Sequence, residues 1–236
     1  HVQISGANGQ LGGWQQVAEE AAAHPQVLAA APFVNAQAML ALGGNVRGAV
    51  VRGIEPKLEE KVADIGAHMI AGRLDALAAG EFRIVLGSEL ARALGARTGD
   101  KVTLIAPQGL VTPAGVLPRL KQFSVSGIFE VGMFEYDSGL ALIDLADAQK
   151  LYRMDERVSG VRLKLKDLFQ ARQVASELLT RLPGELYVSD WTRSHANFFR
   201  AVQIEKTMMS IILFLIVLGA AFNIGSTLVM AVTDKQ

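Results

Sequence analysis

The chain has 236 residues, half of them hydrophobic, and its 23 Lys and Arg balance its 23 Asp and Glu. Without net charge, it has no field that favours nucleic acid or acidic partners. The absence of cysteine excludes disulfide scaffolds, thiol catalysis and cysteine-ligated zinc.

The chain begins with the pattern of a β-α-β unit. Residues 1–5 alternate in the manner of a short strand, and residues 11–23 have the apolar spacing of a helix. His24-Pro25 ends this helix, and the apolar residues 27–34 predict a second strand.

A similar pattern recurs late in the chain. Residues 161–166 (VRLKLK) alternate as a strand, and residues 168–182 predict an amphipathic helix. The expected buried face of this helix consists of Ala171, Ala175, Leu178 and Leu182. Pro183-Gly184 ends it, and a further strand begins at residue 186. We interpret the two units, residues 1–36 and 156–190, as one split α+β subdomain.

The middle of the chain, residues 37–155, predicts an inserted β-rich subdomain. Gly43-Gly44-Asn45 lies between two strand-like runs and is a strong hairpin signal. Ser88 is expected to cap a short helix that Gly95 ends. The remaining expected elements are strands at 84–86, 101–106, 122–130 and 140–143 and helices at 57–66, 89–94 and 144–151.

The gap between two of these strands, residues 107–121 (PQGLVTPAGVLPRLK), is unusual. It has three prolines and neither helical nor strand periodicity, and it is longer than an ordinary hairpin loop. It also carries Leu110, Val111, Val116 and Leu117, which a solvated loop has no structural reason to keep. Two interpretations stay open: these residues pack on the domain's own surface, or the segment protrudes as a partner-binding arm.

Motifs of enzyme chemistry are missing from the sequence. It contains neither GxGxxG nor GxxxxGK[ST], and its four histidines have no metal-ligand spacing. Glu19-Glu20 and Glu59-Glu60 are expected on solvated helix faces. We therefore expect no catalytic residues, no metal and no cofactor.

Residues 208–232 form an uncharged run of Leu, Ile, Val, Met, Phe and Ala. As a helix, the run is long enough to cross a membrane, and its position excludes a signal peptide. A buried helix of a large soluble protein is the less favoured alternative. Residues 191–207 also have a helical pattern, and no proline or glycine separates them from the run. We expect one continuous connecting and transmembrane helix. The ends at His1 and Gln236 indicate a fragment of a longer membrane protein.

Small and polar residues lie within the expected transmembrane helix and favour close packing of another helix. They are Gly219, Ala221, Asn223, Gly225 and Ser226. This pattern predicts a multi-helix protein or a dimer. The flanking charges Arg193, Arg200 and Lys206, against Lys235, would place the preceding domain in the cytoplasm, but this rule is weak beside a large domain.

Several segments resemble the lipoprotein-releasing ABC transporter permeases of Gram-negative bacteria, the LolC/LolE family with MacB-like topology. They are VRGIEP, VLGSELARALGARTGDKVTLIAPQG, MFEYDSGLALIDL, GVRLKLKD, YVSDW and FFRAVQIEKTMMSIILFLIVLGAAFNIGSTLVMAVTDKQ. The resemblance covers essentially the whole chain. It implies a large α+β periplasmic domain between the first two of four transmembrane helices, so residues 1–190 would lie in the periplasm and the chain in the inner membrane.

The resemblance also implies the partners. A separate cytoplasmic ATPase subunit (LolD-like) would hydrolyse ATP, and a second permease subunit would complete a hetero- or homodimer. Lipoprotein substrates would leave the membrane for a periplasmic carrier (LolA-like). In LolC-type subunits a proline-containing hairpin, the hook, recruits the carrier, and Pro113 is the counterpart of its proline. The expected hook residues are Pro107, Leu110, Val111, Thr112, Pro113, Val116, Leu117 and Pro118.

Alternatives remain within and beyond this family. The chain could be LolC-type, LolE-type or a single subunit that serves both roles. Two other classes are a MacB-type efflux permease and an FtsX-like regulator of a cell-wall hydrolase. The segment at 107–121 discriminates, because it has a role only in lipoprotein release.

Overall fold

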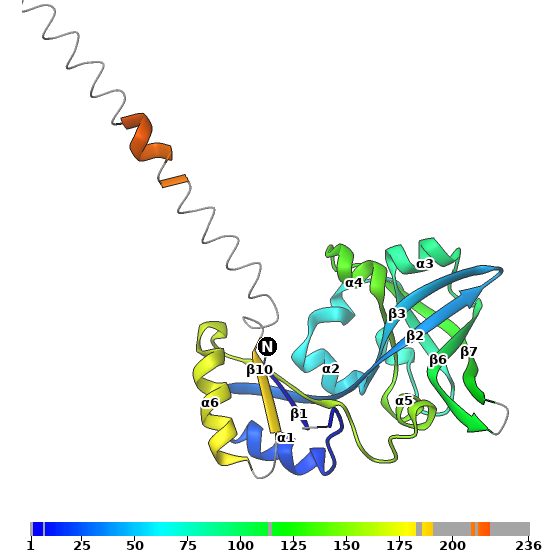
Figure 1. Cartoon of the computed structure of the whole chain (residues 1–236), viewed down its shortest axis with the longest axis horizontal. Helices are drawn as coiled ribbons and strands as arrows, with labels where there is room; N and C mark the ends of the chain where they lie inside the picture. Colours follow the sequence, from blue (N-terminus) through cyan, green and yellow to red (C-terminus); the bar gives the residue numbers. More distant parts are fainter. Residues whose placement is uncertain are drawn as a thin grey trace, which may run out of the picture. The chain divides into compact units, whose positions relative to one another are not determined.

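Ten strands of the described residues form one mixed β-sheet in the computed structural model (Figure 1). The structure describes residues 2–6, 8–112, 115–182, 186–190, 209–210 and 212–217. The strands are β1 Val2–Gly6, β2 Val27–Leu42, β3 Asn45–Ile54, β4 Met69–Gly72, β5 Arg83–Gly87, β6 Lys101–Thr112, β7 Gly115–Phe129, β8 Leu140–Asp144, β9 Gly160–Leu165 and β10 Leu186–Asp190. Their order is β10-β1-β9-β2-β3-β8-β5-β7-β4, and β6 pairs with β2 and β7.

Helices from several parts of the chain pack on this sheet. They are α1 Trp14–Ala22, α2 Pro56–Val62, α3 Ser88–Leu94, α4 Phe134–Gly139, α5 Leu145–Tyr152 and α6 Ala171–Arg181, with 3₁₀ turns at Asp64–His68, Leu74–Ala76 and Leu168–Gln170. The four residues predicted for the buried face of α6 are all buried. α4 has no counterpart among the expected elements.

Strands from both ends of the described domain lie next to each other, as the two β-α-β patterns predict. β1 pairs antiparallel with both β9 and β10, and β9 pairs antiparallel with β2. α1 and α6 pack against this part of the sheet. Buried Ile4, Val161 and Val188 occupy opposed positions on β1, β9 and β10, so one apolar row crosses the three strands.

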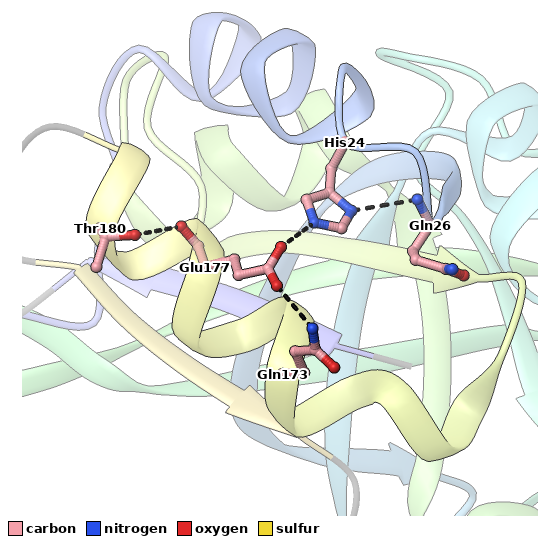
Figure 2. A network of polar contacts seen from close by, with 5 residues as sticks. All are labelled: His24, Gln26, Gln173, Glu177 and Thr180. Carbon is pink, nitrogen blue, oxygen red and sulfur yellow. Dashed lines mark hydrogen bonds and ion pairs between the residues drawn. The ribbon is translucent and has the colours of Figure 1, made fainter.

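A polar contact joins α6 to the loop after α1 (Figure 2). The Nδ1 atom of buried His24 accepts a hydrogen bond from the backbone N–H of Gln26, 3.2 Å away. The Nε2 atom therefore carries the proton and donates it to Oε2 of Glu177 at 2.9 Å. Gln173 donates to the other oxygen of the same carboxylate, also at 2.9 Å. His24-Pro25 thus ends the first helix and also ties it to α6.

The long strand β2 continues through the boundary expected at residue 36. Its first half pairs with β9 as far as Phe33, and its second half pairs with β3 from Phe33 to Leu42. Strands of the expected split and inserted parts therefore belong to one sheet, and the division into subdomains stays a prediction. Gly43 and Gly44 both have positive φ and form a two-residue turn between β2 and β3, which confirms the predicted hairpin.

Buried charge lies where β2 changes partners. Glu59 on α2 is fully buried, and its Oε1 atom accepts a hydrogen bond of 2.6 Å from Nη2 of Arg162 on β9. Arg52 on β3 donates through Nε to Oδ1 of Asn35 at 2.9 Å. Burial and the charge of Arg162 lower the pKa of Arg52 to about 10. The expectation that Glu59 is solvated is wrong, because α2 turns it toward Arg162; Glu60 and Glu19-Glu20 are exposed as expected.

The cap predicted at Ser88 is also wrong. The α3 helix begins with Ser88 itself, Gly87 precedes it with extended backbone, and the Ser88 hydroxyl donates to Glu130, 3.4 Å away. Glycine is required at position 87, because a Cβ there would lie 2.3 Å from the carbonyl oxygen of Asp137. Gly95 ends the helix in the left-handed conformation, as predicted.

Residues 191–236 form a unit separate from residues 1–190. Residues 209–210 and 212–217 of this unit are helical, and their described side chains are exposed. Within the described part of the chain, no helix has the length and hydropathy to cross a membrane. The predicted connecting helix at 191–207 and most of the predicted transmembrane helix at 208–232 lie outside the described residues, as do Gly219, Ala221, Asn223, Gly225 and Ser226.

Candidate docking arm

Strands β6 and β7 run through the segment that the sequence predicts as a loop. Their pairing continues from Lys101↔Ser124 out to Thr112↔Gly115, so residues 107–121, here called the arm, belong to a β-hairpin. The prediction of a segment without strand structure is therefore wrong. The prolines interrupt the alternation of apolar and polar residues that predicts a strand. A strand that pairs along only one edge nevertheless tolerates a residue without an N–H group. Pro113, which lies in the sequence between the paired residues Thr112 and Gly115, is outside the described residues.

The arm leaves the sheet at an irregularity in β6. Ala106 pairs with Arg119, whereas the next recorded pair is Leu110 with Leu117. Three residues of β6, 107–109, therefore face the single residue Pro118 of β7. An excess of residues on one strand bends a hairpin and increases its local twist. Pro107 and Gly109 suit such a place, because one lacks an N–H donor and the other has no side chain.

Beyond this bulge the arm has no other strand beside it among the described residues. β6 pairs with β2 only over Thr103–Ile105, and β7 pairs with β5 from Ser124 onward. Figure 1 shows the outer ends of β6 and β7 at the lower right, apart from the tip of the β2–β3 hairpin. The arm's outer backbone groups are consequently open to a partner.

Arg119, Lys121 and Phe123 form the arm root, the part of β7 that joins the arm to the domain. As alternate residues of one strand, they share one face. Phe123 is fully buried and meets the ring of Phe82 edge to face, with centroids 5.7 Å apart. Lys121 places Nζ 3.7 Å from the centroid of the same Phe82 ring. Arg119 donates from Nη1 to the carbonyl oxygen of Leu151 on α5, at 2.7 Å.

Asp147 of α5 holds Phe82 in place. Its buried carboxylate accepts hydrogen bonds from the backbone N–H groups of Gly80 and Phe82, at 2.8 and 3.0 Å. Phe82 has φ of 49°, a left-handed conformation that is uncommon for a residue with a side chain. These two hydrogen bonds offset the energetic cost of that conformation and orient the Phe82 ring toward the arm root.

Sequence reasoning did not find Phe82 or Asp147. The available signal was the position of Asp147 on the apolar side of the predicted helix, next to Ala148 and one turn before Leu151. An acidic residue on a buried helical face needs donors, and Gly80 and Phe82 supply them from 67 and 65 residues away.

The opposite face of the arm's base is apolar and open. Leu120 is 63% exposed and lies opposite Ile105 of β6. Ile105 in turn pairs with Met39 of β2, which is also exposed. A row of three apolar side chains therefore runs across β2, β6 and β7 beside the arm, exposed at Met39 and Leu120 and half-buried at Ile105. Such a contiguous row is typical of a protein contact surface.

The described part of the chain contains no group of three or more His, Asp or Glu side chains that could hold a metal ion. The features that this part presents for function are the hairpin arm, its charged root and the apolar row beside it. All three suit binding of a protein better than chemistry on a small molecule.

Comparison with known proteins places the chain among membrane transport components. A family model described as the MacB-like periplasmic core domain matches residues 1–181. The lipoprotein-releasing system transmembrane protein LolC of Neisseria meningitidis is 51% identical over 211 residues, 89% of this chain and 51% of that protein. LolC of Xylella fastidiosa is 45% identical over 236 residues, all of this chain and 57% of that protein. LolE of Haemophilus influenzae is 33% identical over 225 residues, 94% of this chain and 53% of that protein.

The chain thus spans about half the length of these relatives. Solved structures with the same fold include the periplasmic region of MacB from Actinobacillus actinomycetemcomitans, with TM-score 0.53 and 14% identity over 86% of this chain and 92% of that one. The extracellular domain of the ABC-type transporter YknZ from Gram-positive bacteria also has TM-score 0.53, with 10% identity over 80% of this chain and all of that one. The predicted α+β, MacB-like fold is confirmed.

Proposed function

Because the chain belongs to the LolC/LolE family of lipoprotein-releasing system transmembrane proteins, with their MacB-like periplasmic core domain, we propose that it is part of an ABC transporter permease. Its transporter releases lipoproteins from the inner membrane and passes them to a periplasmic carrier protein. Residues 1–190 lie in the periplasm, and residues 208–232 cross the inner membrane. The chain binds and positions proteins, and a separate cytoplasmic ATPase subunit hydrolyses ATP.

The β-hairpin arm is the observation that carries the carrier-binding part of this proposal. Its outer strands pair only with each other among the described residues, so they can add to the edge of a partner's sheet or enter an apolar groove. The prolines fix φ and thereby reduce the entropy that the arm loses on binding. The carrier contacts are Pro107, Leu110, Val111, Thr112, Pro113, Val116, Leu117 and Pro118.

The apolar row beside the arm supports a protein partner. Met39, Ile105 and Leu120 extend the accessible surface from the arm onto β6 and β2. An arm alone would bury little area, whereas a specific protein interface commonly buries about 800 Å² on each side.

We assign the chain to the LolC type, whose hook recruits the carrier. Two LolC proteins are 51% and 45% identical to it, and within Haemophilus influenzae its identity is 35% to LolC over 159 residues and 33% to LolE over 225 residues. The second permease subunit packs against residues 208–232, where Gly219, Ala221, Asn223, Gly225 and Ser226 permit close approach of a helix. The helix at 191–207 transmits motion from the membrane to the periplasmic domain.

Reconstitution of the full-length permease tests this function. The permease, its partner subunit and the ATPase subunit are placed in proteoliposomes that carry a lipoprotein. With ATP and soluble carrier, lipoprotein should appear in the supernatant as a complex with the carrier. Omission of ATP or of the carrier is the control. If lipoprotein stays in the vesicles under all conditions while the ATPase is active, the proposed function is wrong.

A further inference from the structure

We propose that Arg119 is a positioning residue, which fixes the direction of the arm before any partner binds by fastening β7 to the C-terminal end of α5. This inference rests on the proposed function of the arm and concerns how that function depends on geometry. It gives Arg119 a role inside the domain and not in direct contact with the carrier.

The place of Arg119 along β7 makes it the pivot of the arm. It pairs with Ala106, the last residue of β6 before the bulge, and the next recorded pair is Leu110 with Leu117. Bulges bend and twist a hairpin, and an isolated two-stranded hairpin is only marginally stable. The direction of everything beyond residue 119 therefore depends on how firmly this residue is held.

The end of α5 is a suitable anchor for a guanidinium group. The carbonyl oxygen of Leu151 belongs to the last turn of the helix, where carbonyl groups lack partners within the helix. A positive charge at this end is favoured by the helix dipole, and hydrogen bonds from charged donors are stronger than neutral ones. The 2.7 Å contact from Nη1 of Arg119 combines both effects.

α5 is itself held along its length. Asp144 caps its first turn by accepting the backbone N–H of Ala146 at 2.9 Å, and Asp147 binds the turn at Gly80 and Phe82. The centroid of the Phe82 ring that this turn presents lies 3.7 Å from Nζ of Lys121. The arm root is thus attached to one rigid group at two points, through Arg119 and through Lys121.

A fixed root lowers the entropic cost of binding. A hairpin that swings on its bulge would sample many directions and would lose this freedom when a partner seats on it. The attachments through Arg119 and Lys121, here called the clamp, restrict the direction of the arm when the domain folds, so this freedom is not lost on binding. Loss of the clamp should therefore weaken binding even though no contact with the partner is removed.

Spin-label distances test the position of the arm directly. The chain contains no native cysteine, so Thr112→Cys near the arm tip and Ala146→Cys on the exposed side of α5 give a defined pair of labels. These changes are introduced into the permease complex, with any cysteine elsewhere in the complex replaced. We expect one narrow distance distribution with Arg119 present and a broad one with Arg119→Ala. Arg119→Lys should restore part of the narrow distribution.

Binding of the purified carrier supplies the second measurement. Arg119→Ala should lower affinity about tenfold, because the internal hydrogen bond to Leu151 no longer restricts the arm before binding. The salt dependence of binding should stay that of the wild type, because the charge does not meet the carrier. The matched control is Arg47→Ala, since exposed Arg47 likewise donates to a carbonyl oxygen, that of Val46, but lies at the β2–β3 hairpin. Arg47→Ala should change neither the distance distribution nor the affinity for the carrier.

The outcomes separate the inference from the function on which it rests. If Arg119→Ala leaves the distances narrow, the clamp is refuted; a simultaneous loss of affinity and of salt dependence would then indicate direct contact. If the wild type binds no carrier but the distances broaden in the variant, the clamp exists and the proposed function fails. Should Arg119→Ala not fold, Lys121→Met removes the other attachment, and unchanged distances there would also count against the clamp.

Discussion

Arg162 and Glu59 form a buried ion pair of 2.6 Å between residues that are 103 positions apart in the chain. It joins β9 to α2 beside Phe33, the residue at which β2 changes its partner from β9 to β3. Burial and then the charge of nearby Arg162 lower the pKa of Arg52. Glu59 therefore compensates positive charge at the point where the two halves of the sheet meet.

Glu59→Ala should lower the free energy of unfolding by about 3–5 kcal/mol, because it leaves Arg162 buried without a counter-charge near Arg52. Urea denaturation followed by circular dichroism measures this loss. The control is Glu60→Ala on the exposed side of the same helix, which should change stability by less than about 0.5 kcal/mol. Equal effects of the two variants would show that the ion pair does not stabilise the contact between β9 and α2.

Gly160→Ala should destabilise the domain by about 2–3 kcal/mol, since its Cβ would lie 2.2 Å from the carbonyl oxygen of Ile4 on the neighbouring strand. The matched control is Gly48→Ala in β3, where an added Cβ meets no atom within 4 Å and φ is not in the left-handed region. That variant should equal or slightly exceed the wild type in melting temperature. A stable Gly160→Ala protein would contradict the close approach of β9 to β1.

The hydrogen bond between His24 and Glu177 should make the stability of the fold depend on pH in the acidic range. Hydrogen bonds from His24 and then Gln173 lower the pKa of Glu177 in the folded state. A carboxyl with a lowered folded pKa stabilises the fold above its unfolded pKa, and this stabilisation disappears as pH falls through the folded value. Glu177→Gln should therefore be less stable than the wild type at pH 7, and the difference should vanish well below the ordinary glutamate value of 4.5.

Denaturation curves at pH 7 and at successively lower pH measure this difference. Glu19→Gln on the exposed side of α1 is the control and should follow the wild type at each pH. A difference for Glu177→Gln that grows as pH falls would contradict the assigned direction of the pKa shift.

Sequence patterns predicted the elements whose signals are local. The Gly43-Gly44 hairpin, the left-handed Gly95 and the buried face of α6 follow from turn chemistry and apolar spacing, and the structure confirms them. The chain order of strands and helices in the two β-α-β units, residues 1–36 and 156–190, was also correct.

Other features depend on partners far away in the chain, which local patterns do not reveal. Glu59 resembles its solvated neighbour Glu60 until the fold brings Arg162 against it. Residues 107–121 lack alternation because prolines interrupt it, yet pairing of β6 with β7 extends through them. For the same reason the anchoring of Arg119 on α5 was not foreseen: its acceptor, Leu151, is 32 residues away.

A rigid connection between domain and membrane is the next consequence of the proposed function. Insertion of Gly-Gly after Gln203 should interrupt the helix predicted at 191–207, since glycine is a poor helix former. Lipoprotein release by the full-length permease should fall, whereas assembly with the ATPase subunit should persist. The control is the same insertion between Gly43 and Gly44, in a turn that already has positive φ. Normal release after insertion at 203 would show that a rigid connection is unnecessary.

Binding of the carrier to a permease that lacks residues 109–117 tests the central claim most directly. The deletion joins Gln108 to Pro118 and leaves the pair Ala106↔Arg119 in place, and the described residues it removes from β6 and β7 pair only with each other. The melting temperature should therefore stay close to that of the intact protein, while affinity for the purified carrier should be lost. Carrier binding that persists in the stable deleted protein would contradict the account.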